Sequence, residues 1–129
     1  MPLVDPPPVP EGGSNHLKAK DLKNKVVIIH PTVHDTVPGK DDKPWEFVAG
    51  DVWVLDRAGV VETGEGVRFS WWRAVSQLKT VMGEYVACKP TELDDNSVEL
   101  VPLSGDAREV AVKIVDRLER GEKVEQEVF

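Results

Sequence analysis

The pattern of apolar and polar residues predicts a mainly β protein with five strands. β-Branched and aromatic residues gather in short runs that Gly, Pro, Asp and Asn separate, which is typical of strands joined by turns. The five predicted strands are residues 25–30, 47–56, 67–72, 84–89 and 98–103. Pro31 directly follows the first strand and is expected to limit its pairing beyond that point. A long polar loop is predicted over residues 34–44.

Two stretches have the apolar spacing of a helix. Apolar residues recur at helical positions from 74 to 82, which predicts a short helix over residues 73–82 that Gly83 ends. A second apolar stripe runs from Val110 to Leu118, and Asp106 stands three residues before Glu109 in a pattern like a capping box. This stripe predicts a second helix that ends near Arg120.

The order of these elements predicts an OB-fold, a five-stranded Greek-key barrel, with a short helix between strands three and four and an added C-terminal helix. We divide the chain into a disordered Pro-rich arm (1–17), the barrel (18–103), the C-terminal helix (104–120) and an acidic tail (121–129). OB-folds bind oligonucleotides on strands two and three, together with the loops that join strands one to two and four to five.

The tryptophans gather on the second and third predicted strands. All 4 Trp lie between residues 45 and 72. After a turn predicted at residues 63–66, alternation places Phe69 and Trp71 on one face of the third strand, and Arg68 and Trp72 on the other. We expect Trp53 and Trp71 to fill the core. The pattern leaves open whether Trp45 and Trp72 are exposed.

Binding of a single strand needs exposed rings for the bases and cations for the phosphates, and each stacked base contributes roughly 1–3 kcal/mol. Rings and cations are interleaved on the predicted loop and on strands two to four. The candidate nucleic-acid contacts are Lys40, Lys43, Trp45, Trp53, Arg68, Trp72, Arg73 and Lys89. Trp53 is included among these candidates, although the alternative expectation is that its ring is buried in the core.

The net charge of −7 argues against a strong phosphate-binding surface over the whole chain. The acids are concentrated at one end, however, because residues 91–129 hold 11 acidic and 5 basic side chains. Residues 18–90 hold 11 basic and 10 acidic side chains, which leaves room for a local basic groove. A single Cys, together with the lack of a secretory signal and of an apolar run long enough to span a membrane, predicts a cytoplasmic protein.

No catalytic constellation or cofactor motif is present, so we expect a protein that is not an enzyme and needs no cofactor. His30 and His34 have the spacing of a helical zinc site, but Pro31 between them makes a helix unfavourable, and we predict no metal site. Cys88 is predicted to be a packed apolar residue in a strand rather than a nucleophile.

Four short motifs resemble those of a family of small proteins from actinobacteria and their phages. They are Ile29-His30-Pro31, Asp51-Val52-Trp53-Val54-Leu55-Asp56, Val75-Ser76-Gln77-Leu78 and Gly83-Glu84-Tyr85-Val86. With an acidic closing helix, the resemblance covers residues 22–118. The chain resembles actinobacterial and actinophage single-stranded-DNA-binding proteins with an OB-fold. It departs from them at residues 87–92 and 96–98, where that family has a basic loop and a Pro-Trp pair that are expected to contact nucleotides.

Two functions remain in competition on the sequence alone. The first is sequence-independent binding of single-stranded DNA in phage replication or recombination, in the host cytoplasm. The second is a protein–protein interaction module of OB-fold origin, such as an adaptor, an inhibitor of a host factor or a virion component. The acidic tail ends in Val128 and Phe129 and resembles the tails with which bacterial single-stranded-DNA-binding proteins dock on replication or recombination partners, although a simple solvated tail is the alternative. A homo-oligomer is compatible with the sequence but not specified by it.

Overall fold

The structure is a computed structural model that describes residues 17–38 and 44–124. Its strands are β1 (Val26–Val37), β2 (Trp45–Asp56), β3 (Gly59–Phe69), β4 (Val86–Glu92) and β5 (Val98–Pro102). Its helices are the short 3-10 helix η2 (Ala19–Leu22), α1 (Trp72–Leu78) and α2 (Gly105–Glu119). The predicted class, the five strands, the helix between the third and fourth strands and the closing helix are confirmed.

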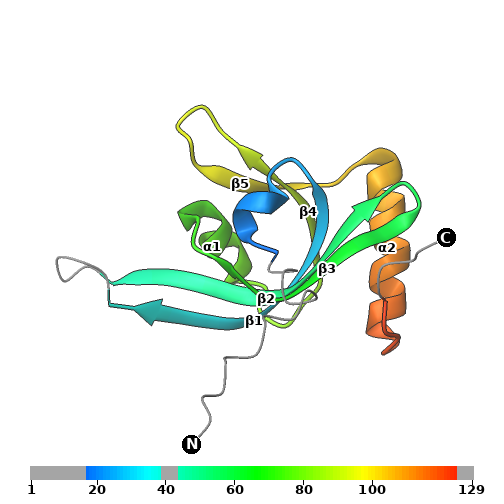
Figure 1. Cartoon of the computed structure of the whole chain (residues 1–129), viewed down its shortest axis with the longest axis horizontal. Coiled ribbons are helices and arrows are strands. Elements are labelled where there is room, and N and C mark those ends of the chain that lie inside the picture. The colour runs from blue at the N-terminus through cyan, green and yellow to red at the C-terminus, as the bar shows by residue number, and fades with distance from the viewer. Residues whose placement is uncertain (1–16, 39–43, 125–129) are drawn as a thin grey trace, which may run out of the picture.

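The strands form one antiparallel sheet in the order β3-β2-β1-β4-β5 (Figure 1). The central strand β1 pairs with β2 over most of its length, but with β4 only from Val27 to Ile29. Strands β3 and β5 are the two edges of this sheet, so the described residues form an open sheet rather than the closed barrel that a Greek-key barrel implies.

A side chain of α1 occupies the edge of β5. The amide nitrogen of Gln77 donates a hydrogen bond to the carbonyl oxygen of Leu100 at 2.9 Å, and the Gln77 amide oxygen accepts one from the Leu100 N–H at 2.9 Å. The Gln77 amide therefore takes the place of one peptide unit of a neighbouring strand. Such a contact protects the centre of an edge strand from pairing with another chain. It also stands where a closing strand would have to pair.

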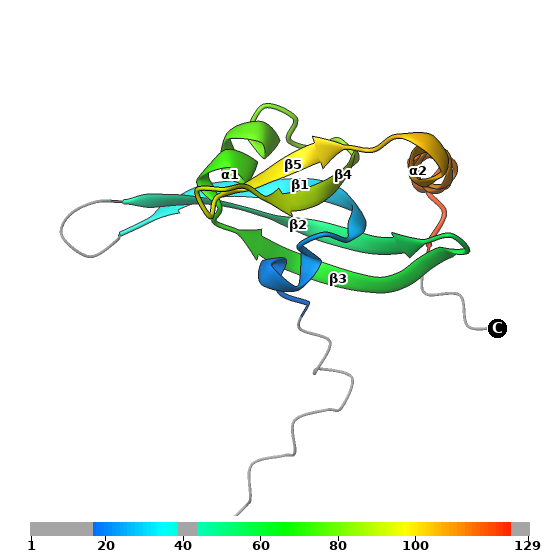
Figure 2. The same cartoon turned by 90° about the horizontal axis from the view of Figure 1, so that it is seen from above.

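The prediction that Pro31 limits the pairing of the first strand holds for β4, which pairs only up to Ile29, but not for β2. β1 continues to Val37 and stays paired with β2, with an irregularity between Pro31 and Val33. Pro31 lacks an N–H, but β4 no longer pairs at this point, and its carbonyl oxygen accepts a hydrogen bond from the Gly83 N–H at 2.8 Å. As a result, β1 and β2 extend together as a hairpin beyond the rest of the sheet (Figures 1 and 2).

The bounds of the third strand also differ from the prediction. β3 begins at Gly59, and the turn predicted at residues 63–66 is a bulged part of this strand, with Gly66 at a φ of 60°. β3 ends at Phe69, and Trp72 is the first residue of α1. Trp72 therefore does not share a strand face with Arg68, contrary to the prediction. The chain turns into a helix here because Ala74, Val75 and Leu78 pack into the core at helical spacing.

The sheet has two faces, each with its own apolar cluster. On the inner face, Val48, Val52 and Val54 of β2 pack with residues of α1 and η2. On the outer face, Ile28 and Leu55 pack with Ala111, Ile114 and Leu118 of α2. α2 lies at the end of the sheet opposite the β1–β2 hairpin in both views (Figures 1 and 2). The hairpin end of the outer face is therefore not covered by α2.

Successive side chains of a strand point to opposite faces, so the odd-numbered residues of β2 share the outer face. The burial of the even-numbered Val48, Gly50, Val52 and Val54 on the inner side agrees with this assignment. Trp45 and Trp53 thus stand on the same face of one strand, Trp45 at its open end and Trp53 at the end under α2.

Candidate nucleic-acid interface

The hairpin end of the outer face carries an aromatic and arginine cluster, which we call the hairpin patch and define as Trp45, Phe47 and Arg68. Trp45 was predicted in a loop but is the first residue of β2, with 42% of its surface exposed. The rings of Trp45 and Phe47 have centroids 6.1 Å apart and are tilted by 54°. The two residues are two positions apart in β2, which places both rings on the outer face.

Arg68 of β3 completes the hairpin patch. Its neighbours Val67 and Phe69 are buried in the inner cluster, so the Arg68 side chain points to the outer face. The Arg68 guanidinium carbon lies 4.5 Å from the centroid of the Phe47 ring, a cation–π contact. Within the described part of the chain, no ion pair involves Arg68. The guanidinium therefore lies over the Phe47 ring and is available to an anionic ligand.

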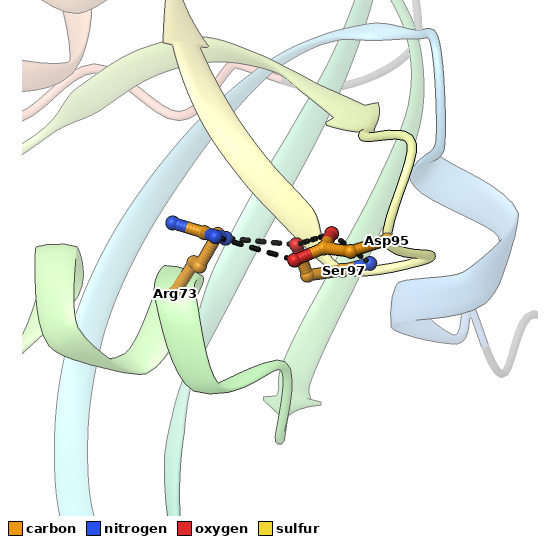
Figure 3. Close-up of polar contacts among 3 residues, drawn as sticks. All are labelled: Arg73, Asp95 and Ser97. Atoms are coloured by element: carbon orange, nitrogen blue, oxygen red, sulfur yellow. Dashed lines mark hydrogen bonds and ion pairs between the residues drawn. The ribbon is translucent and has the colours of Figure 1, made fainter.

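The Trp72–Arg73 pair lies at the start of α1. Trp72 is 61% exposed, and the Arg73 guanidinium carbon lies 4.2 Å from the centroid of its ring. Arg73 also reaches the β4–β5 turn, where its Nε donates a hydrogen bond to Ser97 Oγ at 2.8 Å and its Nη2 pairs with Asp95 at 3.3 Å (Figure 3). Hydrogen bonds from the Ser97 hydroxyl and backbone N–H, and then the Arg73 guanidinium, lower the pKa of Asp95 to about 2. A phosphate at Arg73 would therefore compete with a carboxylate that is charged at any physiological pH.

Trp53 sits in surroundings that suit a core residue better than a phosphate site. It is partly buried, and its indole N–H donates a hydrogen bond to the carbonyl oxygen of Val124 at 3.0 Å. The pocket that it lines is also lined by three acidic residues, Asp51, Glu65 and Glu122, and by one basic residue, Lys123. This surplus of negative charge opposes the approach of a phosphate. Trp71 is likewise partly buried and packs against the inner cluster.

The remaining predicted contacts are separate from the hairpin patch or fall outside the described residues. Lys89 is exposed on β4, and β1 and β2 lie between its strand and the strand of Arg68. Lys40, Lys43, Val128 and Phe129 lie outside the described ranges. The question of exposure that the sequence left open is answered, because both Trp45 and Trp72 are exposed. Phe47 was not among the predicted contacts, although its position two residues after Trp45 was a usable signal.

Cys88 is buried, and His30 and His34 are each engaged in contacts within the chain. Burial raises the pKa of the Cys88 thiol to about 12, so the thiolate is not formed near neutral pH. His34 Nε2 lies 2.8 Å from Glu46 Oε2, a contact that, with Lys79, lowers the pKa of Glu46. His30 instead stacks on Tyr85, with ring centroids 4.4 Å apart.

Residues 17–38 and 44–124 contain no group of three or more side chains suited to hold a metal ion. In the same ranges, no helix has the length and apolar character needed to cross a membrane.

Comparisons of the chain with protein-family models, with curated proteins and with solved structures found no match. The resemblance to single-stranded-DNA-binding proteins of actinobacteria and their phages therefore stays a prediction, and the functional argument depends on the geometry of the site.

Proposed function

We propose that this protein binds single-stranded DNA without sequence preference, on the outer face of β2 and β3 at the hairpin end. The observation that carries the proposal is the hairpin patch, in which an exposed indole lies beside a phenylalanine ring that has an arginine guanidinium over it. The same proposal treats the open sheet as an OB-type barrel, because OB-folds are partly open and bind ligands on strands two and three.

The proposed role of each residue in the hairpin patch follows from the chemistry of its side chain. The face of Trp45 stacks on an unpaired base, an interaction that every base can make and that a base inside a duplex cannot. Arg68 supplies a planar cation for the adjoining phosphate, and its contact with Phe47 limits the rotamer freedom that binding would otherwise remove. Neither contact reads the edge of a base, so binding is independent of sequence. A role in phage replication or recombination is the expectation that comes with the family resemblance.

A titration with oligo-dT tests this function. We expect the tryptophan fluorescence of the full chain to be quenched as oligo-dT is added at about 50 mM salt, because phosphate contacts are strongest at low ionic strength. At about 200 mM salt the affinity should be lower, and a duplex of the same length should bind more weakly than the single strand. Absence of any quenching or binding at about 50 mM salt would contradict the proposal.

A protein–protein interaction module is the second candidate, and the C-terminal helix favours it. Val112 of α2 is 59% exposed, and Trp53 and Arg73 are engaged in contacts within the chain. The acidic surplus of residues 91–129 also suits a protein partner better than DNA. The titration separates the two functions. If oligo-dT does not bind, the module becomes the better explanation, and nuclease-treated host lysate is then the source in which to seek its partner.

A further inference from the structure

An open groove lies beside the hairpin patch, between η2 and the end of β3. Its volume is about 500 Å³. We call it the η2–β3 groove, and it is lined by Leu17, Lys18, Ala19, Lys20, Glu65, Gly66, Val67, Arg68, Ser70 and Trp71. Arg68 belongs both to this groove and to the hairpin patch. The groove and the hairpin patch therefore meet at one residue of the edge strand β3.

The fold holds η2 firmly against the sheet. Leu17, just before η2, and Leu22, its last residue, are both buried in the inner cluster. Gly64 of β3 leaves room for this contact, because a Cβ at Gly64 would lie 3.0 Å from the Cβ of Leu17. The turn that carries Lys18 and Lys20 is thus anchored next to β3 by packing rather than by its own charges.

The groove is locally basic in an acidic protein. Its charged lining residues are three basic ones, Lys18, Lys20 and Arg68, and one acidic one, Glu65. Among the described residues none of these three cations takes part in an ion pair, whereas the nearby Lys23 is paired with Glu92 and Arg73 with Asp95. The Asp21 carboxylate of η2 is held by the backbone N–H of Lys18 at 3.1 Å and is not among the lining residues. Three unpaired cations around one groove favour an anionic ligand.

We propose that the η2–β3 groove holds the phosphodiester backbone of the same single strand that stacks on Trp45. Lys18, Lys20 and Arg68 contact successive phosphates, and the Ser70 hydroxyl is a further hydrogen-bond donor at the groove. The strand then runs from Trp45 across Arg68 to η2. This inference rests on the proposed function and adds a second contact region, with new residues, to the site.

The test is the salt dependence of binding by the Lys18→Ala/Lys20→Ala double variant of the full chain. For a single strand, the slope of log K against log salt changes by about 0.7 for each phosphate that a cation no longer neutralises. We therefore expect the slope to become shallower by about 1.4 in the double variant, with an affinity for a roughly 15-nucleotide oligo-dT that is lower on the order of tenfold at about 100 mM salt. Quenching at saturation should persist, since Trp45 still stacks on a base.

Two controls make the result specific. Lys113→Ala removes an exposed lysine on α2 and should leave the slope unchanged. Lys18→Arg/Lys20→Arg keeps both charges and should restore the slope of the unmodified protein. If the double alanine variant is poorly folded, Lys20→Glu alone carries the same test. An unchanged slope in a variant of a protein that does bind oligo-dT would overturn the groove and leave the hairpin patch intact. Failure of the unmodified protein to bind would overturn both.

Discussion

Replacement of Trp45 by alanine is expected to weaken the binding of oligo-dT by about 1–3 kcal/mol, or roughly 5- to 150-fold. This is the range found when alanine replaces an aromatic side chain that stacks on one base. Trp45 is the exposed ring of the hairpin patch, so its removal takes away the stacking surface and leaves Arg68 with its phosphate. Fluorescence anisotropy of a labelled oligo-dT measures the change directly and does not depend on the missing tryptophan. Trp45→Phe keeps a ring and should recover most of the affinity.

The matched control for Trp45→Ala is Val112→Ala, which truncates an exposed apolar residue on α2, at the other end of the sheet. It should bind oligo-dT as the unmodified protein does. The free energy of unfolding of both variants should lie within about 0.5 kcal/mol of that of the unmodified protein, because exposed side chains contribute little to stability. An affinity that is unchanged by Trp45→Ala would exclude the hairpin patch as the stacking surface.

Replacement of Gly50 by alanine is expected to lower the free energy of unfolding by about 3 kcal/mol or more, the upper end for overpacking in a core. A Cβ at Gly50 would lie 2.1 Å from the carbonyl oxygen of His30 and 2.7 Å from the Cα of Pro31. Both are backbone atoms of β1, so no side-chain rotation relieves the clash. Gly50 thus permits the close approach of β1 and β2 beside the irregularity at Pro31, where the hairpin begins to extend.

Urea unfolding followed by circular dichroism measures the effect of Gly50→Ala. Ala49→Gly, the reverse change at the adjoining residue, is the control, and it should cost only about 0.5–1 kcal/mol because it creates no clash. A Gly50→Ala variant that is as stable as Ala49→Gly would show that the two strands do not approach each other at this position as described. Insoluble expression of Gly50→Ala alone would agree with the expected decrease in stability.

Much of the fold could be predicted from the period of the apolar residues, since five strands and two helices follow from alternation and from helical spacing. The misplaced boundaries share a physical cause, which is that local rules were outweighed by tertiary contacts. Pro31 does not end β1 because β4 no longer pairs at this position. Trp72 is helical rather than extended because the apolar residues that follow it pack into the core.

Whether the sheet is open or closed is a separate question from the bounds of its strands, and the apolar pattern of the sequence could not answer it. Strand order and edge pairing depend on contacts between residues that are distant in sequence, such as those of the Gln77 amide with Leu100. A polar residue on a short helix carries no signal that its side chain will replace a strand. Element order alone therefore predicts the number of strands and their class, but not whether the sheet closes.

The candidate site was predictable in its aromatic part and less so in its charges. Trp45 and Arg68 were identified because rings and cations interleaved on the first loop and on strand three suit a single strand, although the exposure of Trp45 was left open. The surroundings of Trp53 depend on the C-terminal segment, which folds back so that the Val124 carbonyl meets the indole N–H. The grouping of Lys18 and Lys20 with Arg68 depends on the docking of η2 on β3. Net charge conceals such a group, because the acids of residues 91–129 dominate the total.

The most direct test of the binding site uses the 4 tryptophan indole N–H signals of the chain, observed by NMR in ¹⁵N-labelled protein as oligo-dT is added. Single Trp→Phe variants assign the signals. We expect the Trp45 signal to shift strongly as the oligonucleotide saturates the protein. The Trp53 signal should stay in place, because the Trp53 indole N–H donates a hydrogen bond to the carbonyl oxygen of Val124. A Trp45 signal that stays in place at saturation, or a shift confined to Trp53, would contradict binding at the hairpin patch.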